Sequence, residues 1–338
     1  MQTLQKILSF FIVIVLLGGV QAQDVDYSGT SAANLLKIPV GARIAAMGDA
    51  GSALADDATA LFWNPAAAAR IGSLGSISIS TMNWLVDSRL SYLAGVINLG
   101  GFGYVGVDLE YLDYGNMEVT TVYDQDGTGR YVSASDLVFG LGYTRKLTDR
   151  FSFGIKVKYI AEKLASVTGS AFGVDIGADF QTSFFNNNFR ISAVLSNFGT
   201  QMQFEGYDLE VVYTVPGSPS NKQVPAVLKT RGWEIPLLFR FGLSNYFIKN
   251  ENITLQAAYE VMDSRDYEVR HNLGAEFGYR GMFFLRGGYK FNYDEITYTA
   301  GFGLNFKPLI GYGLVIDYVF LDYGVFESMH QFSVAVNF

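Results

Sequence analysis

The chain has 338 residues, of which 49% are hydrophobic, 15% are aromatic and only 17% are charged, against about 25% charged residues in soluble domains, so a water-soluble enzyme is disfavoured. The net charge of −8 argues against a nucleic-acid partner, because such a partner requires a basic surface. The absence of cysteine excludes disulfides, thiolate metal sites, a cysteine nucleophile and a lipidated N-terminal cysteine.

Residues 1–22 have the features of a secretory signal peptide. Lys6 supplies the positive charge, residues 7–17 form an apolar core, and Val20 and Ala22 place apolar or small side chains at positions −3 and −1 of a cleavage site. The apolar core is shorter than the about 20 residues that a membrane-spanning helix needs, so a retained anchor is the less favoured alternative. We expect cleavage near Ala22 and a mature chain that begins at Gln23.

Residues 23–72 are rich in alanine, and we expect short helices and turns in them. Pro65 suits the first turn of a helix, because it has no backbone N–H group to donate. The side-chain oxygen of Asn64 is then placed to cap the alanine run Ala66–Ala69. Trp63 stands beside this cap, where its large side chain would wedge the segment in place.

Residues 73–338 alternate apolar and polar side chains with the period of two that is typical of β-strands. In residues 296–306, for example, apolar side chains at even positions alternate with Thr, Gly and Asn at odd positions. Strands are predicted near residues 74–84, 88–98, 101–112, 134–147, 150–163, 170–181, 188–199, 233–246, 252–262, 268–279, 281–291, 295–306, 311–321 and 329–338.

Strand length separates the two architectures that place alternating strands in one chain. A soluble β-sandwich uses strands of about 5–6 residues, whereas a tilted strand that crosses a bilayer needs about 9–11. The predicted strands have about 10–13 residues and are even in number, as a bacterial outer-membrane barrel requires. The chain is therefore predicted to be an all-β membrane protein, a 14-stranded antiparallel transmembrane β-barrel with an apolar outer face and a polar lumen.

Connection lengths support the barrel independently, because outer-membrane barrels have short periplasmic turns and long external loops. The two long connections, 113–133 and 200–232, fall at one end, and the connections at the other end are short. The last strand then ends on the periplasmic side. Its lipid-facing residues resemble the signal that the bacterial barrel-assembly machinery reads, and they are Phe332, Val334, Val336 and Phe338. We therefore expect the outer membrane of a Gram-negative bacterium, with its lipid and that machinery as partners.

Charged side chains of both signs fall on the predicted lumen face of the strands. We expect them to pair with one another or with the N-terminal segment, and a selective ion path is the less favoured alternative. These side chains are Lys156, Lys158, Asp175, Asp179, Arg240, Glu260, Glu276, Arg286 and Lys290.

No pattern predicts catalytic residues, a cofactor or a metal site. The motif Gly101–Gly106 matches G-x-G-x-x-G but falls inside a predicted strand, where its glycines leave room on the lumen side. Asp124–Gly129 resembles the start of a calcium loop, but Ser133 stands where the loop needs a glutamate, which favours a solvated turn. The only histidines, His271 and His330, lie on different predicted strands without a zinc motif. We expect no enzymatic activity.

The long connection 200–232 is apolar where a solvent-exposed loop would be polar. Exposed apolar side chains suggest a surface for a partner, which would bind by strand addition. Equally, the loop would fold back as a hairpin or cap the barrel mouth. The candidate partner-binding residues are Val211, Val212, Tyr213, Val215, Pro216, Val224, Val227 and Leu228.

Four N-terminal stretches, residues 29–43, 46–50, 54–58 and 63–66, closely resemble the start of PorV/PorQ-family proteins. That family belongs to the wider group of barrels like the long-chain fatty-acid transporter FadL. Asn64-Pro65-Ala66, preceded by Trp63, matches the hatch motif of this group. The resemblance implies an N-terminal helical hatch or plug, residues 23–72, inside a barrel formed by residues 73–338.

The resemblance also implies a role in the type IX secretion system. PorV-type members bind the C-terminal signal domains of secreted cargo and carry them from the translocon to the attachment complex, and PorQ-type members sit in that complex. Our hypothesis is a non-enzymatic secretion component that binds cargo signal domains or complex subunits through its external loops. The alternative is a FadL-like transporter of hydrophobic small molecules, in which the hatch shifts to open a path.

Overall fold

The computed structural model describes residues 29–338, apart from 183, 185–187, 215, 217–222, 295, 312 and 327. The predicted signal peptide, its cleavage site near Ala22, and Val215 of the external loop lie outside the described residues. Within the described part of the chain, no helix is both long enough and apolar enough to span a membrane.

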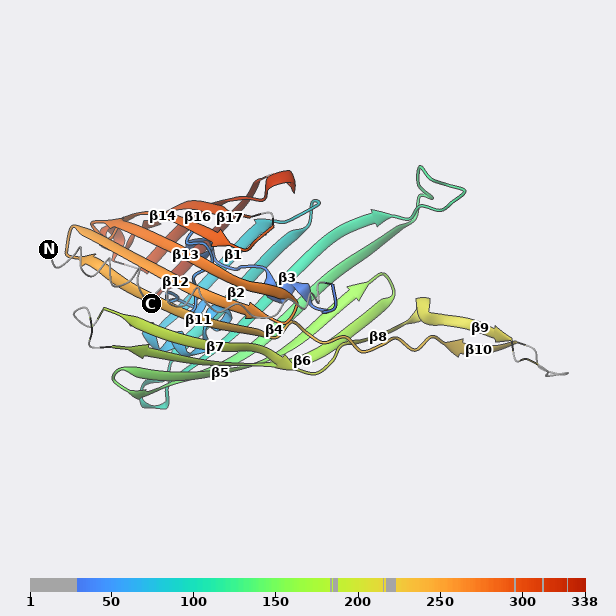
Figure 1. Cartoon of the computed structure of the whole chain (residues 1–338), viewed down its shortest axis with the longest axis horizontal. Coiled ribbons are helices and arrows are strands. Elements are labelled where there is room, and N and C mark those ends of the chain that lie inside the picture. The colour runs from blue at the N-terminus through green and yellow to red at the C-terminus, as the bar shows by residue number, and fades with distance from the viewer. Residues whose placement is uncertain are drawn as a thin grey trace.

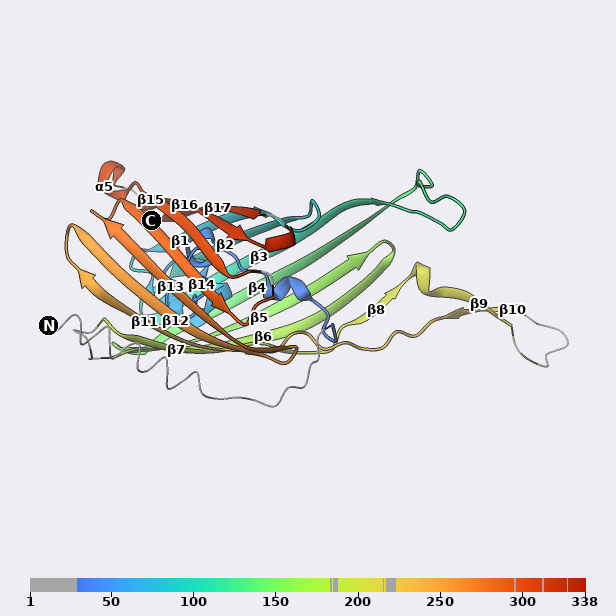
Figure 2. The same cartoon turned by 45° about the horizontal axis from the view of Figure 1, so that its top comes forward.

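Antiparallel strands close into a 14-stranded barrel (Figures 1 and 2), as the alternation predicted. β1 (Gly75–Asn83) pairs with β2 on one side and with β17 (Ser328–Asn337) on the other, and this last pairing closes the sheet. The other wall strands are β2 (Arg89–Asn98), β3 (Tyr104–Glu118), β4 (Tyr131–Thr148), β5 (Phe151–Leu164), β6 (Val167–Gln181), β7 (Arg190–Gly199), β11 (Leu238–Lys249), β12 (Ile253–Ser264), β13 (Tyr267–Tyr279), β14 (Phe283–Phe291), β15 (Tyr298–Asn305) and β16 (Gly313–Asp322).

Several wall strands are longer than predicted, β3 and β4 among them. β3 and β4 contain 15 and 18 residues and stay paired beyond a register shift between Asp113 and Asn116. Gly115, with a φ of +72°, lets β3 bend there without ending. The connection predicted at 113–133 therefore shrinks to 119–130.

β3 begins later than predicted, because the start of the glycine motif forms a turn. Residues Gly100–Phe102 form the short 3₁₀ helix η3, and Gly103 has a φ of +103°. The prediction that Gly101–Gly106 lies inside a strand is therefore wrong for its first three residues. Gly106 does leave room on the lumen side, since a Cβ atom at that position would meet Leu61 at 2.9 Å.

The predicted loop 200–232 contains strands of its own. β8 (Gln203–Gly206) extends the sheet beside β6, and β9 (Glu210–Thr214) pairs with β10 (Gln223–Val227) after the short helix η4 (Tyr207–Leu209). β11 starts only at Leu238, because Pro236 has no N–H group for the sheet ladder.

The two long connections lie at the same end of the barrel, as predicted. The C-terminus lies at the end with the turns 149–150, 250–252 and 280–282. At the other end the β3–β4 and β9–β10 hairpins project well beyond the remaining strands (Figure 1). We call this end the outer mouth.

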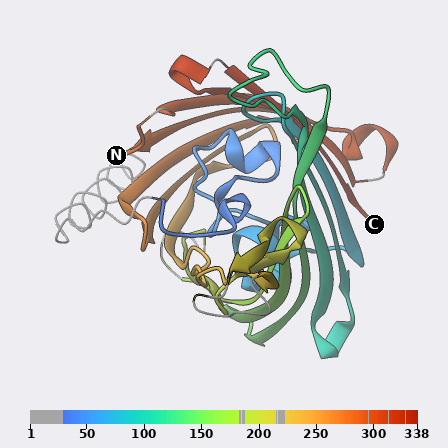
Figure 3. The ribbon, with the colours of Figure 1, turned by 90° about the vertical axis from the view of Figure 1, so that its right-hand side faces the viewer.

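The N-terminal segment lies in the lumen of the barrel (Figure 3). We call its described part, residues 29–72, the hatch. Its small alanines and its larger apolar side chains, such as Leu35, Leu61 and Ile71, are buried in one core with the barrel wall. Its helical elements are η1 (Asn34–Lys37), α2 (Ala42–Ala45), α3 (Ala60–Trp63) and η2 (Pro65–Arg70). Outside the hatch, the short helix α5 (Lys307–Ile310) lies between β15 and β16, and η5 (Gly324–Phe326) lies between β16 and β17.

Candidate functional site

The hatch motif is fixed by the side chain of Asn64, which is fully buried. Its Oδ1 atom accepts a hydrogen bond of 3.0 Å from the backbone N–H of Ala66 and caps η2, as the sequence predicted. Its Nδ2 atom also donates to the carbonyl oxygens of Ser52 at 3.0 Å and of Ala178, on the barrel wall, at 3.2 Å. Asn64 therefore joins two parts of the hatch to the wall.

Glycines on the lumen face of the wall allow this close approach. A Cβ atom at Gly154 of β5 would overlap the backbone of Pro65 and Ala66, and one at Gly177 of β6 would overlap the Asn64 side chain. Any larger residue at these two positions displaces either the wall or the hatch.

Trp63 packs between the hatch and the wall and is almost completely buried. Its indole Nε1 atom donates a hydrogen bond of 3.0 Å to the carbonyl oxygen of Val40. Its ring meets that of Phe62 edge to face at 5.1 Å, and the guanidinium of Arg240 lies 5.1 Å from the ring centroid.

Ion pairs attach the hatch to the wall along its length. Arg43 pairs with Glu276 at 3.1 Å, and Arg70 pairs with Asp179. Lys290 of the wall pairs with Asp49 of the hatch. The prediction that the lumen charges pair with one another or with the N-terminal segment is confirmed.

The other predicted lumen charges pair within the wall. The pairs are Lys156 with Asp108 at 2.8 Å, Lys158 with Asp175 at 2.7 Å, Arg286 with Glu276 at 2.6 Å and with Asp317 at 2.7 Å, and Arg240 with Glu260 at 3.8 Å.

A further ion pair joins the hatch to the turn between β12 and β13. Lys37 Nζ lies 2.6 Å from Asp266 Oδ2, which also accepts a hydrogen bond of 2.7 Å from the Ser31 hydroxyl. Burial alone would raise the pKa of Asp266. Hydrogen bonds from Lys37, Ser264 and Ser31 and the charge of Lys37 outweigh burial, so the pKa lies below its ordinary value.

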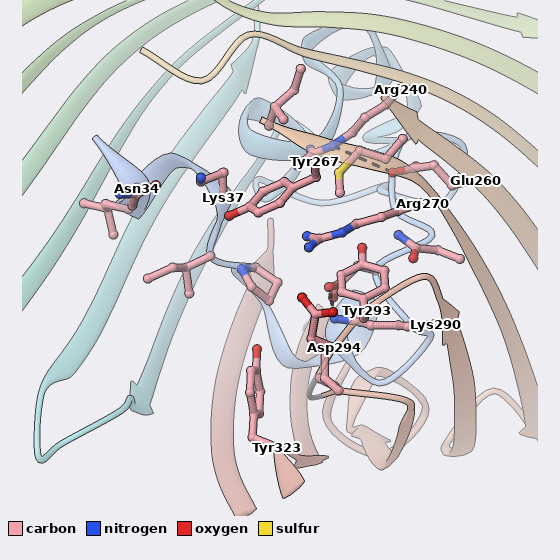
Figure 4. Close-up of a pocket in the computed structure, with 18 of the residues that line it drawn as sticks. Asn34, Lys37, Arg240, Glu260, Tyr267, Arg270, Lys290, Tyr293, Asp294 and Tyr323 are labelled. Carbon is pink, nitrogen blue, oxygen red and sulfur yellow. Dashed lines mark hydrogen bonds and ion pairs between the residues drawn. The ribbon is translucent and has the colours of Figure 1, made fainter. Parts of the chain in front are cut away.

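A cavity of about 400 Å³ lies between the hatch and the wall near the outer mouth (Figure 4). Residues of η1 line one side of it, and residues of β11 to β14 line another. Its aromatic and charged residues include Trp63, Trp84, Tyr267, Arg270, Tyr293 and Tyr323. The sequence reasoning missed this cavity, because these residues come from separate elements that only the strand register brings together.

The candidate partner-binding residues lie on the β9–β10 hairpin and just after it. The exposed fractions of these residues are 68% for Val212, 67% for Val227, 55% for Leu228 and 52% for Tyr213. Val211 and Pro216 are also exposed, and Val224 is half-buried. The loop does form a hairpin, but this hairpin extends away from the barrel instead of covering its mouth (Figure 1).

The β3–β4 hairpin is the second projection at the outer mouth. Its connection exposes Val122 and Tyr123 almost completely. The Glu118 carboxylate accepts a hydrogen bond of 2.9 Å from the backbone N–H of Gly129. Among the described residues, no group of three or more His, Cys, Asp or Glu side chains is arranged to hold a metal ion.

The last strand alternates as predicted, with Phe332, Val334 and Val336 on the exposed outer face and Phe338 at its end. Its backbone pairs with β1 and β16 and thereby forms the closing seam of the barrel.

The closed barrel, its apolar outer face and the buried hatch define the class of outer-membrane secretion and transport barrels. The family described as type IX secretion system protein PorV matches residues 21–215, more than half of the 338 residues, and the chain belongs to this family. No curated protein matches the sequence significantly.

Solved structures share the fold at low sequence identity. The toluene transporter TodX of P. putida is 14% identical, with a TM-score of 0.57 over 88% of this chain and 98% of that one. The toluene transporter TbuX of Ralstonia pickettii is 14% identical, with a TM-score of 0.52 over 88% and 97%. A FadL homologue of Pseudomonas aeruginosa is 12% identical, with a TM-score of 0.51 over 95% and 99%.

Proposed function

We propose that the protein is a non-enzymatic component of type IX secretion that binds the C-terminal signal domains of cargo, or other subunits of the secretion complex, through its outer hairpins. The observation that carries the proposal is the β9–β10 hairpin, which extends beyond the barrel with apolar side chains on both faces. Exposed apolar surface of this kind is typical of a protein interface.

The backbone of the hairpin favours strand addition along β9. Leu228 N donates to Leu209 O at 2.8 Å, so the pairs Val211–Ala226 and Tyr213–Val224 exchange the hydrogen bonds of the hairpin. The alternate pair Val212–Pro225 points its backbone groups outward. Because proline has no N–H group, the free edge of β10 is interrupted, while that of β9 has a donor at Val212.

Replacing Val212 and Val227 by Asp tests this proposal, because both residues belong to the exposed hairpin. The expected result is loss of secretion subunits and cargo from the material that co-purifies in mild detergent, with an unchanged amount of folded barrel. Val325→Asp is the matched control, since Val325 is an 81% exposed valine between β16 and β17 at the same end. Undiminished co-purification of these partners with the double variant would contradict the proposal.

The cavity beside the hatch supports a second candidate function, the transport of hydrophobic small molecules by a shift of the hatch. Part of its lining is apolar, and it adjoins Trp63 of the hatch motif. Co-purification in mild detergent separates the two candidates. Secretion partners or cargo are expected for the first, and bound lipid-like molecules without protein partners for the second.

Two further parts of the proposal concern how the chain matures and how the barrel assembles. We propose that the signal peptide is cleaved near Ala22, that residues 23–72 and 73–338 act as hatch and barrel, and that Phe338 with its neighbours on β17 is read by the barrel-assembly machinery of a Gram-negative outer membrane. N-terminal sequencing of the mature protein should give Gln23. Deletion of Phe338 should reduce the amount of assembled barrel in the outer membrane.

A further inference from the structure

A column of alternating cations and aromatic rings crosses the cavity near the outer mouth (Figure 4). Lys37 Nζ lies 4.4 Å from the ring centroid of Tyr267, and Arg270 Cζ lies 3.7 Å from the same ring. On its other side, Arg270 Cζ lies 4.2 Å from the ring of Tyr293, which is 5.1 Å from Lys290 Nζ. Arg270 is therefore held between two tyrosine rings at the centre of the column.

The two outer cations of this column are neutralised, and the central one is not. Lys37 pairs with Asp266, and Lys290 pairs with Asp49. Arg270 makes no ion pair with any described residue, and its Nε atom is buried without a hydrogen-bond partner. A buried polar group of this kind is costly unless a partner satisfies it.

The chemistry of a stacked guanidinium defines the missing partner. The two rings cover its faces and leave the in-plane N–H donors at its edge, which points into the cavity (Figure 4). A planar carboxylate is the anion that such an edge binds with two parallel hydrogen bonds. Asp49, Glu260 and Asp294 also line the cavity, and Asp294 makes no ion pair with any described residue. The cavity therefore has no large excess of positive charge, which favours a monoanion over a phosphate dianion.

We propose that this cavity binds a carboxylate at Arg270, carried on an apolar or aromatic body that packs against Trp84 and Tyr323. A small organic acid and the free C-terminus of a polypeptide that enters from the outer mouth supply the same chemistry. The cavity volume of about 400 Å³ lies within the range of small-ligand sites. This inference is independent of partner binding by the hairpins.

Trp63 and Trp84, two of the three tryptophans, line the cavity and report binding by their fluorescence. The full-length mature protein in phosphatidylcholine nanodiscs is titrated with 3-phenylpropionate and with its neutral amide. A second pair of probes is an N-acetylated tripeptide ending in phenylalanine, with a free or an amidated C-terminus. We expect at least one carboxylate to bind about tenfold or more tightly than its amide, as a charged hydrogen-bonded pair provides.

Arg270→Gln should lose this preference, and Arg270→Lys should retain only part of it, because an ammonium is not bidentate. Arg280→Gln, which removes an arginine beside Tyr279 at the opposite end of the barrel, is the matched control and should bind as the unmodified protein does. Asp294→Asn should tighten binding, because it removes a negative charge from the cavity lining.

The pair of probes that shows the preference identifies the source of the carboxylate. Preference only for phenylpropionate assigns a small organic acid, and preference only for the free tripeptide assigns a polypeptide C-terminus. If both carboxylates bind no better than their amides, or if folded Arg270→Gln retains the preference, the proposal is overturned.

Discussion

The hatch and the outer hairpins use the same residue types in opposite ways. In the hatch, apolar side chains are buried, and the charges at Arg43, Asp49 and Arg70 each have a partner on the barrel wall. In the β9–β10 hairpin, valines stand exposed and the edge of β9 has no partner among the described residues. The contacts inside the barrel therefore hold the hatch in place, whereas the outer hairpins expose apolar surface that a partner would bury.

The largest effect on the hatch is expected from Asp179→Asn. The Asp179 side chain is buried, and it pairs with Arg70 of the hatch and, at 3.0 Å, with Arg190. Removing one partner from a buried ion pair costs about 3–5 kcal/mol, because the other charge stays buried. Chemical unfolding, followed by a reporter on the hatch, should give a loss of this size.

Removal of Arg70 in the same chain should reverse part of that loss. The Arg70→Gln/Asp179→Asn variant no longer buries the unpaired hatch charge, so it should be more stable than Asp179→Asn alone. Equal stability of the single and double variants would show that this ion pair does not hold the hatch.

A smaller loss is expected from Asn64→Ala, about 2–3 kcal/mol. A cap alone contributes about 1 kcal/mol, but Asn64 also donates to the carbonyl oxygens of Ser52 and Ala178, so its truncation removes two further hydrogen bonds. The barrel should assemble normally and become more permeable to small solutes, as measured by liposome swelling. Identical swelling rates for the two folded proteins would mean that other contacts keep the hatch closed.

Gly154→Ala should loosen the hatch by about 1–3 kcal/mol through overpacking. The added methyl group meets the backbone of Pro65 and Ala66, which has no flexible end that can move aside. Gly95→Ala is the matched control, because a Cβ atom at Gly95 of β2 meets nothing within 4 Å. If both variants swell liposomes at the same rate, the hatch does not press on the wall at Gly154.

The smallest effect should be a pH dependence of the contact between Lys37 and Asp266. Because the pKa of Asp266 is lowered in the folded protein, this stabilisation is complete above the ordinary value of about 3.9 and is lost as the pH falls below it through the folded value. A nitroxide at Ala32→Cys should become more mobile on acidification. Asp266→Asn should show the mobile spectrum at every pH, and a pH response that survives in this variant would assign the effect to another group.

The barrel fold could be predicted from the sequence, because each wall strand, such as β17, repeats one apolar face. It also indicated that lumen charges pair, but not which ones, since the pairing of Asp179 with Arg70 depends on how the hatch folds inside the barrel. A hairpin was one of the two alternatives expected for loop 200–232, but its strand bounds and its direction away from the barrel were not predicted, because short strands in a loop have no alternation long enough to recognise. The stack around Arg270 depends on residues from η1, β13, β14 and a turn, which only the register aligns.

A disulfide between the hatch and the wall tests most directly whether the outer hairpins bind their partners while the hatch stays in place. The hydroxyl oxygens of Ser52 and of Ser192 on β7 lie 3.0 Å apart in the core, so cysteines at both positions are placed to form an S–S bond of about 2.05 Å. The native chain contains no other cysteine to interfere. Our account predicts that Ser52→Cys/Ser192→Cys recovers the same amounts of secretion subunits and cargo when oxidised and when reduced. Recovery that is lost on oxidation and restored by a reductant would contradict the account and would show that partner binding requires movement of the hatch.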